Sequence, residues 1–357
     1  MSRNKYRRLN LAIRIFTNVH LVRRKLLIGK AVFSGALLLA LGAELQPAWA
    51  QQKSQDLEIV QLRPNFYMIA GAGGNIALET GPDGSVLVDA GSAESADRVI
   101  AAIKRLTKYP VRYIIDTTSD ADHVGGNGKV SKGAGQNVQA AGPEPLGGEV
   151  AKEMTNGYAA TIMSTEQVLF RMSAPTGKVA AFPNDSWPVE TIFSSRKTLS
   201  LNGDAIEIFH MPSHTDGESI VFFRHSDVVV AGDALDMTRF PRIDLDRGGS
   251  IEGEIATLNK LVELTVVPLP FIFNGPSTYV VPGHGRACEQ IDVVNYRDMV
   301  VTIRDIIQDL IKNGKTLEQV KAAKPAEPWA SQYGSERGSY SADQFVEAVY
   351  KSLKGVK

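Results

Sequence analysis

Four short segments of the chain place histidine or aspartate beside glycine, where an apolar run ends. Asp122 and His123 precede Val-Gly-Gly-Asn, and His214 opens the run His-Thr-Asp-Gly-Glu. Asp233 lies in Ala-Gly-Asp-Ala and His284 in Pro-Gly-His-Gly. Loops at strand ends are where a rigid scaffold displays ligands, and imidazole with carboxylate suits zinc, iron or manganese. One such histidine alone is usually structural, but the recurrence of the pattern indicates a metal site.

The other histidines after residue 50 and the cysteine receive structural interpretations. His210 is expected in the core or at the surface, with support of a metal-binding imidazole as the alternative. His225 follows Arg224 at an expected hairpin turn and should be exposed. Cys288 is the only cysteine in the sequence, which excludes an intramolecular disulfide and a cysteine-based zinc site. We expect it to be a buried thiol.

Strands and one early helix are predicted around these segments. Ser92 is expected to cap a helix that ends before Pro110, and a polar, glycine-rich loop is expected over 117–128. Residues 148–197 are expected to be irregular, with some helix and a long loop. Strands are predicted at 67–69, 75–79, 85–89, 111–116, 205–210, 220–224, 228–231 and 279–281.

The C-terminal part of the chain reads as helical. Apolar residues at helical spacing predict a helix over 291–312, which Gly314 ends. Two shorter helices should follow, because Thr316 and Ser341 each begin a capping box with glutamine. Strands, a helix and further strands together predict a layered α/β sandwich with short C-terminal helices.

The first fifty residues have the order of a secretory signal peptide. A basic stretch ends in Arg-Arg-Lys at 23–25, an apolar segment follows over 26–41, and Ala48-Trp49-Ala50 precedes Gln51 as a cleavage signature. A membrane anchor is the alternative, but the uninterrupted apolar run is short for a span. The arginine pair leaves two export routes open, the general secretory route and twin-arginine export. We therefore expect a periplasmic or secreted protein with no stable membrane anchor after cleavage.

Charge argues against nucleic acid as a partner. The chain has 39 basic and 39 acidic residues, but nine of the basic and one of the acidic residues lie in 1–50. The remainder therefore carries 30 basic against 38 acidic residues, a net charge of −8. Nucleic-acid binding needs a basic footprint, so a small-molecule substrate is expected instead. The oligomeric state is left open.

The motifs resemble those of the metallo-β-lactamase superfamily over roughly residues 58–310. Val-Asp-Ala-Gly at 88–91 is similar to its first motif, and residues 118–127 are similar to its His-x-His-x-Asp-His motif with the following Gly-Gly-Asn. His214, Asp233 and His284 match the later motifs. The resemblance implies a four-layer αβ/βα sandwich. It divides the chain into a signal peptide (1–50), this domain (51–312) and a C-terminal helical extension (313–357).

The sequence departs from the motif at its two leading histidines, where Thr118 and Asp120 stand. By resemblance, one metal site is complete, with the ligands Asp122, His123, Asp233 and His284. The other site retains His214 and the shared Asp233, with Asp120 as a substitute carboxylate. We expect one firmly held ion, while two ions and no functional ion remain the alternatives. Zinc is the expected metal, with iron or manganese as alternatives.

The resemblance implies a secreted hydrolase in which a metal-bound hydroxide attacks an ester, lactone, thioester, amide or β-lactam bond. Asp122 would orient the nucleophile and transfer the proton. Asp89, Asn127 and Asp216 are candidates for orienting the metal ligands. Two other function classes remain open at this point. One is an iron-dependent oxidoreductase, which the oxygen-rich ligand set favours, and the other is a non-catalytic binding protein with a decayed site.

Overall fold

A seven-stranded sheet, in the order β1-β2-β3-β4-β5-β6-β7, forms the first half of the fold. The computed structural model describes residues 56–135, 159–175, 177–267, 276–334 and 340–355. Strands β1 to β4 pair antiparallel, whereas β4 to β7 pair parallel. The strands are β1 (Glu58–Arg63), β2 (Phe66–Ala70), β3 (Ile76–Glu79), β4 (Ser85–Val88), β5 (Val111–Ile115), β6 (Thr161–Thr165) and β7 (Glu190–Ile192).

A five-stranded sheet, in the order β12-β11-β10-β9-β8, forms the second half. Its strands pair antiparallel except for the parallel pair of β11 and β12. Because β11 and β12 run in the same direction, their carboxyl ends lie at one edge, and Asp236 pairs with His284 there. The strands are β8 (Arg196–Leu201), β9 (Asp204–His210), β10 (Ser219–Phe223), β11 (Val228–Asp236) and β12 (Tyr279–His284).

Helices connect the strands and cover the sheets. The α-helices are α1 (Ala96–Leu106), α2 (Ala121–Val124), α3 (Asn127–Ala134), α5 (Glu166–Met172), α6 (Ile251–Leu264), α7 (Gln290–Lys312), α8 (Leu317–Ala322), α9 (Ala330–Tyr333) and α10 (Ala342–Lys354). The 3-10 turns are η2 (Ala93–Ser95), η3 (Asn184–Ser186), η4 (Leu245–Arg247) and η5 (Glu327–Trp329). The capping boxes at Thr316 and Ser341 begin α8 and α10, as the sequence predicted.

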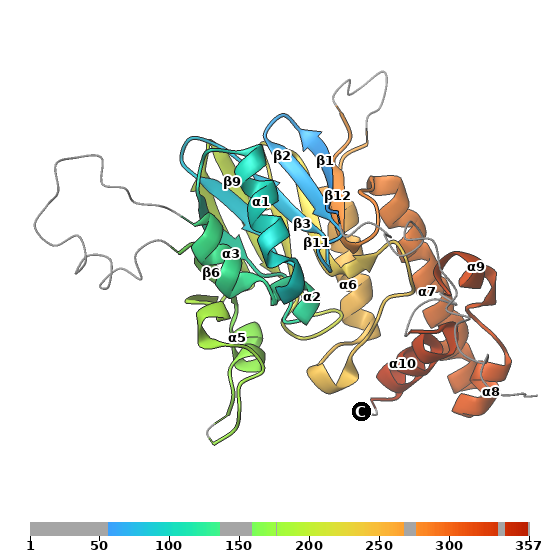
Figure 1. The fold of residues 1–357 in the computed structure, drawn as a ribbon. Coiled ribbons are helices and arrows are strands. Elements are labelled where there is room, and N and C mark those ends of the chain that lie inside the picture. The colour runs from blue at the N-terminus through green and yellow to red at the C-terminus, as the bar shows by residue number, and fades with distance from the viewer. Residues whose placement is uncertain (1–55, 136–158, 176, 268–275, 335–339, 356–357) are drawn as a thin grey trace, which may run out of the picture. The chain divides into compact units, whose positions relative to one another are not determined.

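The elements stack in four layers (Figure 1). The inner faces of the two sheets share one apolar core, in which Phe66 of β2 meets Phe223 of β10 edge to face. Helices α1 and α3 cover the outer face of the seven-stranded sheet. Helices α6 and α7 cover the five-stranded sheet, and α10 joins the same core through Phe345. This arrangement confirms the predicted four-layer α/β sandwich with short C-terminal helices.

Several parts of the fold differ from the sequence prediction, since β1 and β8 were not among the predicted strands and α2 lies within the expected loop over 117–128. The segment 148–197 was expected to be irregular, but its described part contains β6 and β7, which extend the first sheet. Strand β6 is buried on both faces, so its sequence lacks the alternation that marks a half-exposed strand. Helix α6 was also missed, although Ile251, Ile255 and Leu258 have helical spacing and are buried.

The predicted signal peptide lies outside the described residues. Within the part of the chain that the structure describes, no helix is long and apolar enough to cross a membrane.

Candidate metal centre

The predicted metal ligands lie together at one edge of the sandwich, although they come from segments far apart in the sequence. They form two groups whose ligand atoms lie within 4.8 Å of one another, one being Asp122, His123 and His284, and the other Asp120, His214 and Asp233. Asp120, Asp122 and His123 follow β5. His214 follows β9, Asp233 lies within β11 and His284 ends β12.

The group around His284 has the geometry of a metal site. The Nε2 atoms of His123 and His284 lie 3.2 Å and 3.5 Å from the same oxygen, Oδ1 of Asp233. Oδ2 of Asp122 lies 3.1 Å from Nε2 of His284. That nitrogen makes no hydrogen bond to the described residues. Two imidazoles and two carboxylates that converge in this way fit one divalent ion with nitrogen and oxygen ligands.

Asp89 holds the ring of His123 in place. Its Oδ2 lies 2.8 Å from Nδ1 of His123 and accepts from the hydroxyl of Thr117, while Oδ1 accepts from the backbone N–H of Thr117. A carboxylate accepts only, so Nδ1 of His123 carries the proton and Nε2 faces Asp233. Asp89 adopts φ +62°, a left-handed conformation that aspartate tolerates better than most residues. The sequence prediction that Asp89 orients a ligand agrees with this contact.

A glycine-rich turn after β2 closes over the same group. A Cβ at Gly74 would lie 2.5 Å from the ring of His123, so this close approach requires glycine. The N–H of Gly74 donates to the carbonyl of Asp122, and the side chain of Asn75 donates to the carbonyls of Pro282 and Gly285. The sequence analysis assigned this segment no role at the site. It supports two loops that carry ligands.

In the second group, Asp120 and His214 are both in contact with an arginine that the sequence analysis did not predict. His214 donates through Nδ1 to the carbonyl of Arg242 at 2.6 Å, and its Nε2 lies 3.2 Å from Asp120. The guanidinium of Arg247 pairs with both oxygens of Asp120 and also contacts Nε2 of His214 at 3.3 Å. Thr118, two residues before Asp120, is fully buried. The structure therefore brings the predicted ligands together, but with a cation among them.

Burial and mutual charge act in opposite directions on these groups. Burial alone would raise the pKa of Asp233, but the imidazoles of His123, His214 and His284 hold that pKa well below 3.8. Burial opposes protonation of His214, yet its hydrogen bond to Asp120 raises its pKa to about 9. The close approach of the His284 imidazole lowers the pKa of Asp122. A divalent ion would compete with protons for the same ring nitrogens.

Two buried acids near His214 were also missed. Glu218 accepts from the hydroxyl of Thr215 at 3.0 Å, and burial raises its pKa to about 7. Burial raises the pKa of Glu254 well above 4.5, and neither of its carboxylate oxygens has a hydrogen-bond partner among the described residues. The position of Glu218 at the end of the Thr-Asp-Gly-Glu run after His214 could have identified it from the sequence. No sequence feature pointed to Glu254, because α6 was not predicted.

Other candidates lie away from the ligand groups. Asn127 donates to the buried carboxylate of Asp116. The side chain of Asp216 pairs with Arg171, and its carbonyl lies 2.7 Å from Nε2 of His210. His225 is exposed, as predicted. Cys288 is buried, also as predicted, and burial raises its pKa to about 12.

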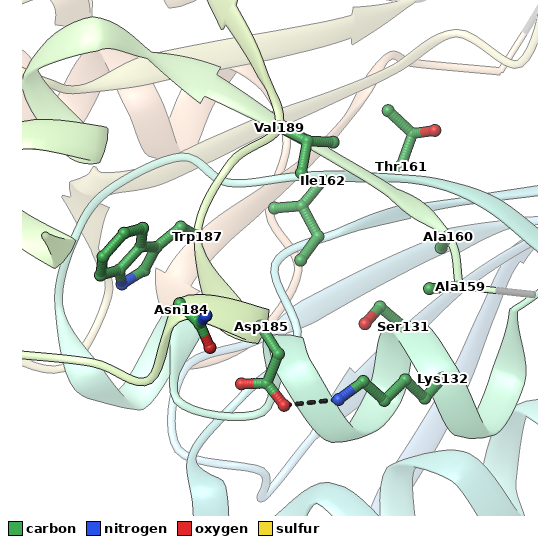
Figure 2. Close-up of a pocket in the computed structure, with 10 residues that line it drawn as sticks. All are labelled: Ser131, Lys132, Ala159, Ala160, Thr161, Ile162, Asn184, Asp185, Trp187 and Val189. Atoms are coloured by element: carbon green, nitrogen blue, oxygen red, sulfur yellow. Dashed lines mark hydrogen bonds and ion pairs between the residues drawn. The ribbon is translucent and has the colours of Figure 1, made fainter. Parts of the chain in front are cut away.

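A cavity of about 460 Å³ adjoins His284. Its lining includes Val60, Met68, Ala70 and Ala287, with Arg286 and Glu58 also present. A second cavity, of about 420 Å³, lies between α3 and η3, where Lys132 pairs with Asp185 (Figure 2). Trp187 lines that second cavity, which contains none of the predicted metal ligands. The cavity beside His284 is therefore the better candidate for substrate.

Comparison with known proteins agrees with this geometry. Residues 70–271 match the family model described as the metallo-beta-lactamase superfamily. A linear primary-alkylsulfatase of Pseudomonas sp. (strain ATCC 19151) is 20% identical over 299 residues, which cover 77% of this chain and 54% of the relative.

Solved structures of alkylsulfatases share the fold. A stereoselective inverting sec-alkylsulfatase from Pseudomonas sp. has a TM-score of 0.54 at 14% identity, with coverage of 83% of this chain and 50% of that one. A double mutant of a sec-alkyl sulfatase has a TM-score of 0.56 at 14% identity, with coverage of 84% and 51%. The chain thus spans about half the length of these alkylsulfatases.

Proposed function

Because the chain belongs to the metallo-β-lactamase superfamily, we propose that it is a hydrolase that cleaves an ester of a small organic molecule with one firmly held divalent ion. The ligands of this ion are Asp122, His123, Asp233 and His284. The observation that carries the proposal is the convergence of both Nε2 atoms on one oxygen of Asp233. Zinc is the proposed ion, since two imidazoles and two carboxylates suit it.

Each ligand has a distinct part in this proposal. A bound divalent ion supplies Lewis-acid activation of water and of the ester. His123 is fully buried and is held by Asp89, so its ring has a fixed orientation in the site. The side chains of Asp122 and His284 are 41% and 20% exposed, so solvent and substrate reach the site from their side. Asp122 is therefore placed to orient water and to accept its proton.

Alkyl sulfate esters are the substrate class that we propose to test first. The relatives named above are alkylsulfatases. The cavity beside His284 has apolar side chains from β1, β2 and the loop after β12, and its size suits a small ligand. An alkyl chain in this cavity would place a polar head group next to His284. Asp120, the carboxylate that made the oxidoreductase an alternative, is paired with Arg247, so hydrolysis is the reaction that we propose.

The test compares substrates and variants of the zinc-loaded protein. Release of inorganic sulfate from a medium-chain alkyl sulfate is measured by ion chromatography, beside hydrolysis of a carboxylic ester, a lactone and a β-lactam. Asp122→Asn and His284→Ala should each reduce the rate by ~10²-fold or more. His225→Ala is the matched control, because this histidine is exposed at the turn between β10 and β11. Equal rates for all variants would overturn the site assignment.

We also propose that residues 1–50 direct export and are then removed. The support is the order of a basic stretch, an apolar stretch and a small-residue cleavage signature in that segment. The active form would then begin near Gln51.

A further inference from the structure

The position that a first metal ion would take is lined by a guanidinium. Arg247 lies on η4, in the loop that follows β11, and Asp120 precedes α2. Nη1 of Arg247 pairs with Oδ1 of Asp120, and Nη2 lies 3.3 Å from Oδ2. This two-pronged arrangement is the strong form of an arginine–carboxylate pair. The carboxylate that would have to substitute for a missing histidine is therefore already bound to a cation.

The remaining imidazole of this group is enclosed as well. Nε2 of His214 lies 3.2 Å from Oδ2 of Asp120 and 3.3 Å from Nη2 of Arg247. In a neutral ring, with its proton on Nδ1 toward the carbonyl of Arg242, Nε2 accepts from Arg247. In a protonated ring, Nε2 donates to Asp120. In neither case does the nitrogen have a lone pair free for an ion.

Three further contacts hold Arg247 in this position, one through its guanidinium and two through its backbone carbonyl. Nε of Arg247 donates to Asp244 at 2.8 Å. The backbone carbonyl of Arg247 accepts from Arg171 at 2.8 Å and from the N–H of Asp216 at 3.0 Å. Only 26% of the side chain is exposed. Displacing Arg247 would break the pairs with both Asp120 and Asp244, so an incoming ion would have to compete with a fixed charge.

We infer that the guanidinium of Arg247 takes the place of the first metal ion. The protein then binds one ion through Asp122, His123, Asp233 and His284, with a permanent positive charge beside it. This inference rests on the proposed metal-dependent function. It goes beyond the loss of the two histidines, because it assigns the weakness of the first site to a residue that blocks it.

The experiment counts ions without measuring activity. Full-length protein is loaded with Zn²⁺, dialysed against a weak chelator and analysed for zinc per chain by elemental mass spectrometry. The wild type should retain one ion. Arg247→Gln removes the cation and frees Asp120 and His214, so the content should rise toward two. Co²⁺ absorption spectra, recorded during titration, should show a second set of bands in that variant alone.

Arg242→Gln is the matched control. Arg242 belongs to the same loop and carries the same charge, but its Nη1 lies 3.9 Å from Asp120 and its side chain is 48% exposed. This variant should retain one ion, as the wild type does. Arg247→Met, which keeps the apolar stem, replaces the glutamine variant if that one unfolds.

The outcomes separate this inference from the proposed function. Two firmly bound ions in the wild type would overturn the inference and leave the metal-dependent function standing. One ion in the wild type and in both Arg247 variants would overturn it too, because the arginine would then exclude nothing. No retained ion in any of the proteins would overturn both. An increase in both Arg242→Gln and Arg247→Gln would point to general charge and refute the specific role of Arg247.

Discussion

Asp89→Asn is the sharpest test of how the proposed metal ligands are oriented. The substitution keeps the size of the side chain, and asparagine tolerates the left-handed backbone at φ +62°. Asp89 accepts hydrogen bonds from the backbone and the hydroxyl of Thr117 and from Nδ1 of His123. A carboxylate offers two accepting oxygens, whereas asparagine offers one oxygen and one donating amide. The three bonds cannot all survive.

Either orientation of the new amide has a cost. If its oxygen faces His123, its NH₂ group opposes the buried N–H of Thr117, and an unsatisfied buried donor costs ~1–3 kcal/mol. If its NH₂ group faces His123, Nδ1 must accept and the proton moves to Nε2, where the proposed ion binds. Loss of such an orienting partner typically weakens metal affinity ~10–100-fold. We therefore expect both lower stability and weaker zinc binding.

The assay measures the two effects separately. Zinc affinity is obtained by competition with a chromophoric chelator, and stability by denaturant unfolding of the metal-free protein. Asp204→Asn is the matched control, since Asp204 is also buried and accepts from the N–H groups of His225 and Ser226 at 2.8 Å and 2.9 Å. The control should lose stability and keep its zinc affinity. Equal zinc affinity in wild type and Asp89→Asn would refute the orienting role.

Three further predictions concern the rest of the chain. Burial and the charge of Asp204 raise the pKa of Glu79 from 4.5 to about 8, so the folded state binds more protons and stability should fall as pH rises through this range. Glu79→Gln should flatten this dependence and raise the melting temperature most near pH 8; an unchanged pH profile would contradict the prediction. Phe345→Ala, at the contact of α10 with Phe240, should lower the free energy of unfolding by ~3–5 kcal/mol, with one cooperative denaturant transition. Two separate transitions would argue against a core shared by α10 and the sandwich. The intact mass of the exported protein should correspond to a chain that begins near Gln51. A periplasmic form that retains residue 1 would refute cleavage.

The sequence was sufficient for the general fold and for the ligand types. Glycine-flanked histidine and aspartate segments identified five of the ligand residues that the structure gathers at one sheet edge, and the family resemblance added the sixth, Asp120. Periodicity and turn residues predicted most strands of both sheets, because half-buried strands and tight turns have local signals. Strand β6 and helix α6 are two of the elements that were missed. The first is buried on both faces, and the polar Glu254 and Thr257 interrupt the buried face of the second.

Only the tertiary structure decided what surrounds the ligands. Asp120 and Arg247 are 127 residues apart, and Asn75 and Gly285 are 210 apart, yet both pairs are in contact. No local pattern predicts such pairs, because they depend on how the loops after separate strands come together at the sheet edge. From the sequence alone, the first metal site was merely short of two histidines. Its occupation by a guanidinium follows from the path of the loop after β11, which brings the half-buried Arg247 to the carboxylate of Asp120.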